Sequence, residues 1–204
     1  MLDLYYANSG NSLRAVIALE ESGLAYTPHK IDLAAGDQKA PDFLAINPSA
    51  AVPVLVDRDG PGGQPAVLSQ SGLIALHVAE RTGRFLPADP ARRLQALRWF
   101  FAAVTDAAAA NSYRRYVPRA VPGLTPETAA FLDGRLVEVL GVFDGLLEGQ
   151  EHLAGELSIA DFALFPVVRL ARPLLESEGG FSRLLGWADR LAARPGVARA
   201  IAAL

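Results

Sequence analysis

The 204-residue sequence contains no cysteine. This absence excludes disulfide bonds, thiolate metal ligands and any redox chemistry carried by the protein's own sulfur. The sequence also has no apolar run that approaches the roughly 20 residues of a membrane-spanning helix, and its first residues lack the basic and apolar regions of a secretion signal. We therefore expect a cytoplasmic protein with no membrane partner, in which any reactive thiol must arrive with a ligand.

Clustered positive charge is absent as well. The net charge is −3, and the only lysines, Lys30 and Lys39, accompany arginines that are scattered along the chain. This distribution provides no basic surface, so we expect no nucleic-acid partner. The three histidines, His29, His77 and His152, show no metal-ligand spacing, and we expect no metal site.

Apolar residues make up 51% of the sequence, which is enough for one large or two small cores. In the first half of the chain, strand-like and helix-like segments alternate. Strands are expected at 2–6, 26–33, 52–57 and 66–68, and helices at 11–22, 41–46 and 71–82. A strand, a helix and a strand in this order predict two parallel strands joined by a right-handed crossover.

From Pro90 onward no strand pattern occurs. Alanine- and leucine-rich helical patterns occupy 92–110, 126–148, 158–174 and 181–191. We therefore expect one domain at 1–86 and an all-helical domain at 90–204. Ser158 and Asp161 form a capping box in which Asp replaces the usual Glu, and this element is expected to be structural.

A proline lies inside the third strand pattern, where it cannot donate to the hydrogen-bond ladder. One explanation is a cis peptide bond between Val52 and Pro53, which would turn the backbone N–H and C=O of Val52 toward a bound peptide. An ordinary trans proline in a loop is the alternative.

Two further polar segments stand at helix starts. Gln70 and Ser71 lie where backbone N–H groups could hold a carboxylate, although Ser71 could equally be a simple N-cap. Ser9 and Asn11 lie where a hydroxyl and an amide could stabilise a bound thiolate, or could cap the helix. Ser9 and Ser12 have the spacing of a Cys-x-x-Cys motif, but without sulfur they cannot run a dithiol cycle.

The order of these elements resembles the glutathione transferase superfamily. The resemblance spans nearly the whole chain and includes the Ser9 loop, Asn47-Pro48, Val52-Pro53, Gln70-Ser71-Gly72, the Ser158 capping box and Arg194-Pro195-Gly196-Val197. At 4–11, 60–63 and 82–87 the chain is most similar to the bacterial nu class, whose members often show glutathione-dependent disulfide reductase activity. The resemblance implies an α/β plus all-α fold class, with a thioredoxin-like N-terminal domain and an all-helical C-terminal domain.

The resemblance also implies a binding site for glutathione. The backbone of Val52, beside a cis Pro53, would pair with the cysteinyl part, while Gln70 and Ser71 would hold the γ-glutamyl carboxylate and amine. The chain departs from the family at 50–51, where two alanines replace a common lysine or glutamine and remove an expected contact with the glycyl end. Gln70 replaces a common acidic residue, which keeps the hydrogen bonding and loses one negative charge.

By the same resemblance, Ser9 and Asn11 would face the sulfur as catalytic donors. Tyr5 and Tyr6 are alternatives, because some classes use a tyrosine near this point. Strand alternation sends their two rings to opposite faces, so we expect one of them in the core and rank both below Ser9.

A second substrate is expected against the first long helix of the C-terminal domain. Tyr113, Arg114 and Tyr116, together with Arg115, could grip an anionic or aromatic group by charge-assisted and stacking contacts. A solvated helix end is the alternative. The large aromatic side chains before them are expected in core or subunit-interface packing: Trp99, Phe100 and Phe101.

These features together predict a glutathione transferase with glutathione as co-substrate and no metal, which activates the thiol for attack on a small electrophile. A glutathione-dependent disulfide-bond reductase is one alternative, and a non-catalytic ligand-binding protein of the same fold is another. The resemblance also implies a homodimer. The physiological substrate is left open.

Overall fold

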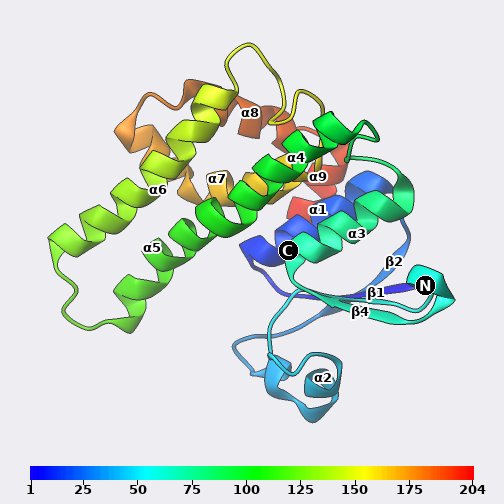
Figure 1. Cartoon of the computed structure of the whole chain (residues 1–204). Coiled ribbons are helices and arrows are strands. Elements are labelled where there is room, and N and C mark those ends of the chain that lie inside the picture. Colours follow the sequence, from blue (N-terminus) through cyan, green and yellow to red (C-terminus); the bar gives the residue numbers. More distant parts are fainter. The chain divides into compact units, whose positions relative to one another are not determined.

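The computed structural model describes residues 1–204, and its contacts divide the chain into two compact units (Figure 1). The sheet unit comprises Met1–Arg84 and Arg194–Leu204, and the helical unit comprises Phe85–Ala193. One unit thus mixes strands and helices and the other is all-helical, in agreement with the expected fold class. The boundaries 1–86 and 90–204 stay a prediction for separate domains, and residues 194–204 make their contacts in the sheet unit.

The sheet has four strands in the order β2-β1-β3-β4. These are β1 (Leu2–Tyr6), β2 (Tyr26–Lys30), β3 (Val54–Asp57) and β4 (Ala66–Ser69). The β1 and β2 strands are parallel, as predicted, and the other neighbours are antiparallel. Leu4 and Leu55 are register partners and fully buried, so the apolar side of the pleat forms the centre of this core.

Helices cover this sheet on both sides. The helices α1 (Gly10–Ser22) and α3 (Ser71–Thr82) lie on one face, and the short α2 (Pro41–Ile46) lies on the other (Figure 1). The last helix, α9 (Pro195–Ala203), packs against α1. Two ion pairs hold it there, Arg194 with Glu21 and Arg199 with Glu20, each at 2.7 Å, which explains why the end of the chain belongs to the sheet unit.

Two strands are shorter than their sequence patterns. The β2 strand ends at Lys30 instead of residue 33, because the Asp32 side chain turns the chain by accepting two backbone N–H groups of the following turn. The β3 strand begins at Val54 instead of residue 52, because Pro53 has no N–H to donate. Two short 3-10 turns complete the unit, η1 (Asp37–Lys39) and η2 (Pro61–Gly63).

The helical unit contains α4 (Pro90–Ala102), α5 (Ala108–Ala120), α6 (Pro126–Leu146), α7 (Ile159–Glu178) and α8 (Ser182–Ala192). A π-helical turn, η3 (Ala103–Ala107), joins α4 to α5, so that they run as one long segment (Figure 1). The central helix is α7, which is largely buried and contacts every other helix of the unit. No helix of the chain combines the length and the apolar character needed to cross a bilayer.

The start of α7 is a fully satisfied capping box. Ser158 and Asp161 are both fully buried, and the Ser158 N–H donates to Asp161 Oδ2 at 2.9 Å. Asp161 Oδ1 accepts from the backbone N–H of Leu153 at 3.1 Å and from Trp187 Nε1 at 2.9 Å. These bonds join α7 to α8 and to the preceding loop, and they confirm the capping box that the sequence predicts.

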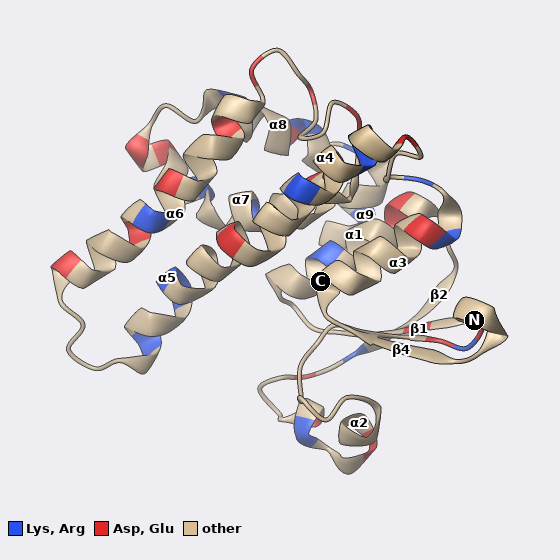
Figure 2. Ribbon diagram, in the orientation of Figure 1, with Lys and Arg blue, Asp and Glu red and all other residues tan.

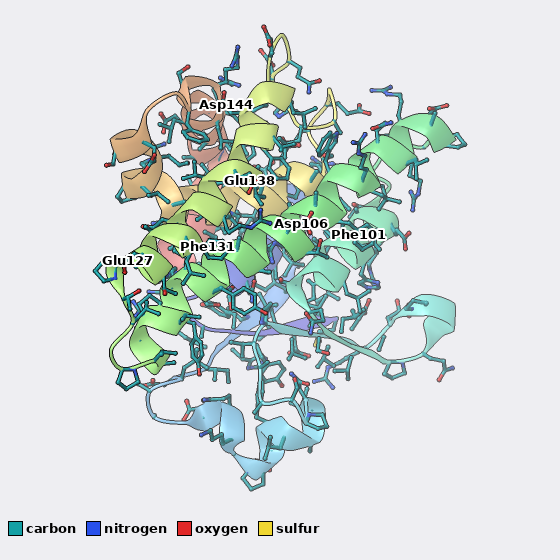
Figure 3. The ribbon with its side chains drawn as sticks, turned by 60° about the vertical axis from the view of Figure 1, so that its left-hand side comes forward. Phe101, Asp106, Glu127, Phe131, Glu138 and Asp144 are labelled. Carbon is teal, nitrogen blue, oxygen red and sulfur yellow. The ribbon has the colours of Figure 1, made fainter.

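A second buried carboxylate starts α8. Asp144 on α6 (Figure 3) accepts the backbone N–H of Leu184 at 2.9 Å, which is the task of an N-cap residue, and it also accepts from Arg183 at 3.1 Å. The helical unit therefore uses buried aspartates for architecture.

Candidate functional site

The candidate residues of the sheet unit meet at one edge. Tyr5 of β1 pairs with Val54 of β3, and Val54 pairs with Ser69 of β4. The end of β1, the start of β3 and the end of β4 therefore lie side by side. The loop before α1, the bond between Val52 and Pro53, and the start of α3 all extend from this edge.

Ser9 is the N-cap of α1. Its Oγ accepts the N–H of Ser12 at 3.1 Å and donates to the Ser12 Oγ at 3.0 Å. The Ser12 Oγ in turn accepts the N–H of Ala7 at 3.1 Å. This chain of hydroxyl groups closes the turn between β1 and α1. Capping therefore accounts for the position of Ser9, and its contact with a sulfur stays a prediction.

Asn11 lies exposed in the first turn of α1, and its amide is oriented. Its Oδ1 accepts a hydrogen bond from Nη1 of Arg14 at 3.1 Å. Because a guanidinium group can only donate, the contacting atom must be the amide oxygen, and the Nδ2 group points elsewhere. Asn11 therefore has a donor that is available to a ligand.

Arg14 connects Asn11 to the start of α3. The same Nη1 donates to the Oγ of the buried Ser71 at 2.6 Å. Arg14 is only 2% exposed, and burial lowers the pKa of its guanidinium group to about 10, so it keeps its charge at neutral pH. The N-terminal ends of α1 and α3 already favour an anion. The buried cation adds a positive charge close to both helix starts.

The peptide bond between Val52 and Pro53 is cis, as expected. Since β3 begins at Val54, neither backbone group of Val52 belongs to the sheet ladder, and no turn or cap uses them. Asn47 Nδ2 donates to the carbonyl group of Ala51 at 2.8 Å and holds the loop before the bond. The backbone of Val52 is thus available to a peptide-like ligand.

The start of α3 has no side-chain cap. Gln70 precedes the helix with a φ of +90°, a value that residues with a side chain rarely adopt, and its own side chain makes no capping hydrogen bond. The first N–H groups of α3 therefore have no partner from the N-cap residue. An uncommon backbone beside free N–H groups fits a position that holds an anion.

Two polar residues of interest were not predicted from the sequence, Arg14 at this edge and Gln38 in the turn after β2. Arg14 had a signal, because it is the one charged residue in the apolar run 13–19. Gln38 of η1 had none. Its Oε1 is buried without a hydrogen-bond partner, which is uncommon in proteins and makes it a candidate ligand contact.

The tyrosines of β1 point to opposite faces, as predicted, and one of them is in the core. Tyr6 is buried, and its hydroxyl group donates to the carbonyl group of Ala203 at 3.3 Å. Tyr5 stacks on His29 with ring centroids 4.6 Å apart and meets the edge of Phe43. Both rings have structural partners, and their ranking below Ser9 as donors to a sulfur stays a prediction.

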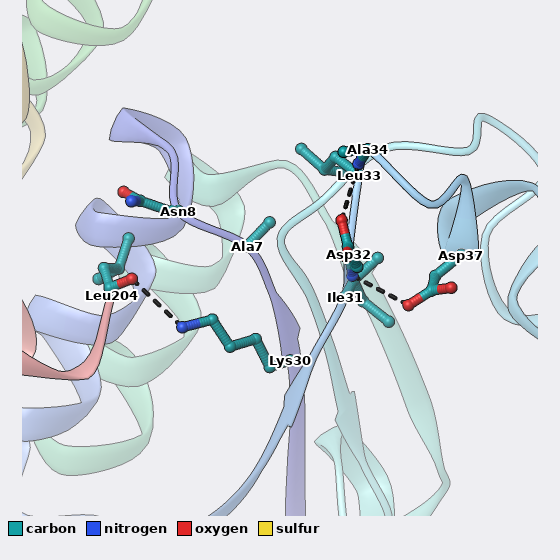
Figure 4. Close-up of a pocket in the computed structure, with 9 residues that line it drawn as sticks. All are labelled: Ala7, Asn8, Lys30, Ile31, Asp32, Leu33, Ala34, Asp37 and Leu204. Carbon is teal, nitrogen blue, oxygen red and sulfur yellow. Dashed lines mark hydrogen bonds between the residues drawn. The ribbon is translucent and has the colours of Figure 1, made fainter.

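A cavity of about 510 Å³ lies beside the loop before α1 (Figure 4). Its wall consists of Ala7 and Asn8 from that loop, residues 30–34, Asp37 and Leu204. The volume is within the range of small-molecule sites. Because Asn8 directly precedes Ser9, the cavity is adjacent to the start of α1.

The candidate substrate residues of the helical unit lie on α5, which continues to Ala120 instead of ending near residue 110. Tyr113 and Tyr116 are 62% and 69% exposed, one turn apart. The Arg114 guanidinium group pairs with Asp133 of α6. The two tyrosines are therefore available to a partner, whereas the charge of Arg114 is balanced within the unit.

The aromatic residues before α5 divide between core and surface. Phe100 is buried, and Trp99 packs edge-on against Phe143 with ring centroids 5.8 Å apart. Phe101 is 52% exposed on the outer side of α4 (Figure 3).

Charges of both signs are interspersed along the helices (Figure 2). No group of three or more His, Asp or Glu side chains could hold a metal ion. The groups present at this edge are hydrogen-bond donors, backbone groups and one buried cation.

The family comparisons cover both units. Residues 8–81 match the glutathione S-transferase N-terminal domain, and residues 109–195 match the glutathione S-transferase C-terminal domain. The disulfide-bond oxidoreductase YfcG of Escherichia coli is 32% identical over 203 residues, which cover 98% of this chain and 94% of that protein. The disulfide-bond oxidoreductase YghU of the same organism is 30% identical, over 97% of this chain and 73% of that protein.

Solved structures agree with these matches. A glutathione transferase from Pseudomonas putida, with one glutathione disulfide bound per subunit, has a TM-score of 0.88 and 32% identity, covering 98% of this chain and 90% of that chain. A glutathione transferase from Burkholderia graminis, with two glutathione molecules bound per subunit, has a TM-score of 0.86 and 31% identity, covering 98% and 86%. The fold is therefore a thioredoxin-like N-terminal sheet with a helical C-terminal domain, as expected.

Proposed function

Because the chain belongs to the glutathione transferase superfamily, we propose that it binds glutathione at the edge of its sheet and activates the bound thiol as a nucleophile. The convergence of three features at that edge carries the proposal: the unused backbone of Val52, the open start of α3, and the link from Asn11 through Arg14 to Ser71. Each feature supplies what a different part of a tripeptide needs.

In this proposal the cysteinyl backbone pairs with the N–H and C=O of Val52 beside Pro53, as an added strand does at a sheet edge. The γ-glutamyl carboxylate lies at the start of α3, where Ser71 and the free N–H groups are positioned and Gln70 adds a polar side chain. An N–H of the peptide would satisfy the buried Oε1 of Gln38. The charge of Arg14 favours an anionic ligand over a neutral one.

Asn11 is the better-supported donor to the sulfur. Arg14 holds its amide oxygen, so the Nδ2 group is left to donate. Ser9 donates its hydroxyl proton to Ser12, and it would have to rotate to reach a ligand. A thiolate at the start of α1 is further stabilised by the helix dipole and by Arg14, which lowers the pKa of the thiol. We propose Asn11 as the catalytic donor and Ser9 as the cap and second donor.

The second substrate, in our proposal, is a disulfide. Two curated relatives are named disulfide-bond oxidoreductases, and this chain has no cysteine with which to form its own mixed disulfide. The glutathione thiolate attacks one sulfur of R–S–S–R′, which forms GS–S–R and releases R′–S⁻ to take up a proton. A second glutathione thiolate attacks GS–S–R, releases R–S⁻ and leaves glutathione disulfide. Two glutathione molecules are thus oxidised for each disulfide reduced.

Conjugation to a small electrophile uses the same thiolate. It is the second candidate, because glutathione S-transferase 3 of Zea mays is 30% identical over 96% of this chain. The proposed substrate contacts Tyr113, Arg114 and Tyr116 apply to either substrate, with the exposed tyrosines as the accessible part of that set.

The test supplies the pure protein with glutathione and 2-hydroxyethyl disulfide, and separately with glutathione and a chromogenic aryl chloride. Turnover of the disulfide is the expected result. Turnover of the aryl chloride alone would replace disulfide reduction with conjugation. Inactivity in both assays despite glutathione binding in a calorimeter would leave a non-catalytic binding protein, and absence of binding would remove the proposal.

We also propose a homodimer. Large apolar side chains stay exposed on the helical unit, among them Phe101 on α4 and Phe131 on α6, which lie with Asp106 and Glu138 on the side shown in Figure 3. Exposed large apolar side chains are candidates for burial at an interface between subunits. Light scattering should give a two-subunit mass for the wild type and a smaller mass for Phe101→Asp. A wild-type monomer would contradict the proposal.

A further inference from the structure

The outward face of α5 carries two tyrosines and two arginines. Tyr113 and Tyr116 are more than half exposed, and Arg115 and Arg119 are exposed as well. At 3.6 residues per turn, these four positions fall within about half of the helix circumference. Tyrosine and arginine are enriched at the energetic centres of protein interfaces. The face therefore has the composition of a surface that binds a partner.

No carboxylate balances the two exposed arginines. The α5 helix contains no Asp or Glu (Figure 2), and the ion pair of its third arginine, Arg114 with Asp133, lies on the side that meets α6. Neither Arg115 nor Arg119 forms an ion pair. Because they are four positions apart, their like charges repel along one side of the helix. An anionic partner would offset this repulsion.

The other nearby carboxylates have their own partners or lie far off. Glu138 of α6 pairs with Arg135, and the carboxylate of Glu127 is hydrogen-bonded by its own backbone N–H in the first turn of α6. Asp106 precedes Arg115 by nine positions, which is about 13 Å along the helix. That separation exceeds the Debye length at physiological salt. The positive charge of this face is therefore not cancelled locally.

The dipole of α5 explains only part of the pattern. Arg119 lies in the last turn, where the C-terminal end of a helix favours a cation. Arg115 lies one turn earlier, and the dipole effect falls off within the last turn. It also gives no reason for two exposed tyrosine rings. A contact with a partner accounts for all four residues.

The geometry of the face suits an extended polypeptide. Small-molecule sites are concave, whereas these side chains project from the outside of a helix. Arg115 and Arg119 are separated by a rise of about 6 Å along the axis. In an extended chain, side chains on the same side recur every second residue, at about 7 Å. Two carboxylates in such a segment can therefore meet the two arginines, with the tyrosine rings against the rest of the segment.

We propose that the face formed by Tyr113, Arg115, Tyr116 and Arg119 docks an acidic segment of a polypeptide substrate, so that disulfides flanked by acidic residues are preferred. The inference rests on the proposed function, because it names the class of disulfide that the bound glutathione thiolate would attack. The two arginines are specificity-determining residues, and the bond changes are those given above.

The kinetic test compares two short peptides whose cysteine is in a disulfide with 2-mercaptoethanol. In one peptide glutamates alternate with serines beside the cysteine, and in the other lysines replace the glutamates. The net charge of −3 would by itself favour the basic peptide. We expect the wild type to prefer the acidic peptide about tenfold in kcat/KM, and Arg115→Gln/Arg119→Gln to lose most of this preference, as expected for two exposed charge pairs.

The matched control is Arg58→Gln/Arg92→Gln. It removes two exposed arginines that pair with Asp3 and Glu156, and it changes the net charge by the same amount. This variant should keep the preference, and high salt should abolish the preference in the wild type. A wild type without preference for the acidic peptide, or equal losses in the two double variants, would overturn the inference.

A second test needs no turnover. An acidic peptide with serine in place of cysteine carries a fluorophore, and its anisotropy reports binding. The wild type should bind it about tenfold more tightly than Arg115→Gln/Arg119→Gln, and the basic peptide should not compete. A single-stranded nucleic acid of equal charge that displaces the peptide at lower concentration would overturn the inference.

The two tests separate this inference from the proposed function. Binding of the acidic peptide that depends on the two arginines, without turnover of any disulfide, would support the docking face and overturn disulfide reduction. Turnover of both peptides with equal efficiency would leave disulfide reduction in place and overturn the docking face.

Discussion

Two helix starts in this protein carry a serine N-cap, and they differ in what surrounds the serine. At α7, Ser158 and Asp161 are both fully buried. The Asp161 carboxylate also accepts hydrogen bonds from the backbone N–H of Leu153 and from the Trp187 ring N–H. At α1, Ser9 is half-buried and bonds to another hydroxyl group. The first cap has only protein partners and stabilises the fold. The second lies at an open edge, where neighbouring donors are left for a ligand.

The start of α3 extends this comparison to a third case. Gln70 provides no side-chain cap, and the buried Ser71 behind it is held by Arg14. The three helix starts therefore differ in how far their polar groups are hydrogen-bonded within the protein. The start of α7 has a complete capping box, the start of α1 has a serine cap, and the start of α3 has no side-chain cap. We expect stability to depend most on the first and ligand binding most on the last two.

The largest effect on stability is expected at the buried capping box of α7. Asp161→Ala should lower the free energy of unfolding by about 3 kcal/mol or more, because several buried N–H groups lose their acceptor. Urea denaturation measures this change. Asp189→Ala removes an exposed carboxylate paired with Arg172 and should change the free energy by less than about 1 kcal/mol. Similar small losses in both variants would contradict the distinction between a buried and an exposed carboxylate.

For Arg14 we expect a large effect on ligand affinity and a small effect on stability. Arg14→Met should weaken glutathione binding about tenfold or more, because the anchored Asn11 and Ser71 lose their common donor. Stability should change by less than about 2 kcal/mol, since the desolvation penalty of the buried cation is removed as well. Calorimetry and urea denaturation measure the two quantities.

Arg58→Met is the control for Arg14, because the Arg58 side chain is exposed and pairs with Asp3 away from these helix starts. It should leave glutathione affinity unchanged. A large loss of stability with unchanged affinity in Arg14→Met would assign Arg14 to architecture.

A smaller effect separates Ser9 from Asn11. Ser9→Ala should lower the free energy of unfolding by about 1 kcal/mol through loss of the cap, whereas Asn11→Ala should leave it within about 0.5 kcal/mol. Both substitutions should raise the pKa of the bound glutathione thiol, Asn11→Ala more than Ser9→Ala. Thiolate absorbance against pH gives this pKa. Unchanged titration in both variants would remove both residues from the catalytic role.

The smallest effect concerns Asp57 in β3, a fully buried carboxylate that caps no helix. Burial by itself would raise the pKa of Asp57, but hydrogen bonds from His77 at 2.8 Å and from the N–H of Asp59 at 3.0 Å, together with the charge of Arg81, hold it below its usual value. A carboxylate with a lowered folded-state pKa stabilises the fold above its unfolded pKa, and this contribution is lost as the pH falls through the folded pKa.

Asp57→Asn should therefore flatten the decline of the free energy of unfolding below about pH 4, which urea midpoints across the acid range would show. An unchanged acid slope would mean that burial and the hydrogen bonds cancel at this position, and a steeper decline would mean that burial outweighs them.

Local patterns predicted much of the fold. The helices α2 and α3 begin and end at the predicted residues, because Pro41 suits a first helical position and Gly83 ends α3 with a left-handed backbone. The end of β2 was wrong by three residues, because the periodicity of the pattern does not reveal that Asp32 turns the chain.

The candidate site was found in part. The order of the polar segments singled out Ser9, Asn11, Val52, Gln70 and Ser71, and their roles toward glutathione stay predictions. Arg14 and Gln38 were missed, because their interest lies in burial and in partners from other segments. Burial is a property of the packed chain and leaves little trace in neighbouring residues.

By itself the sequence determined the order of strands and helices, the absence of a protein thiol and the places where helices start, because periodicity, capping and composition act over a few residues. Only the tertiary structure decided that Arg14 joins Asn11 to Ser71, which lies 57 positions after Arg14, and that Lys30 reaches the end of the chain at Leu204. Those facts depend on which elements pack together, and packing is settled by contacts between distant segments.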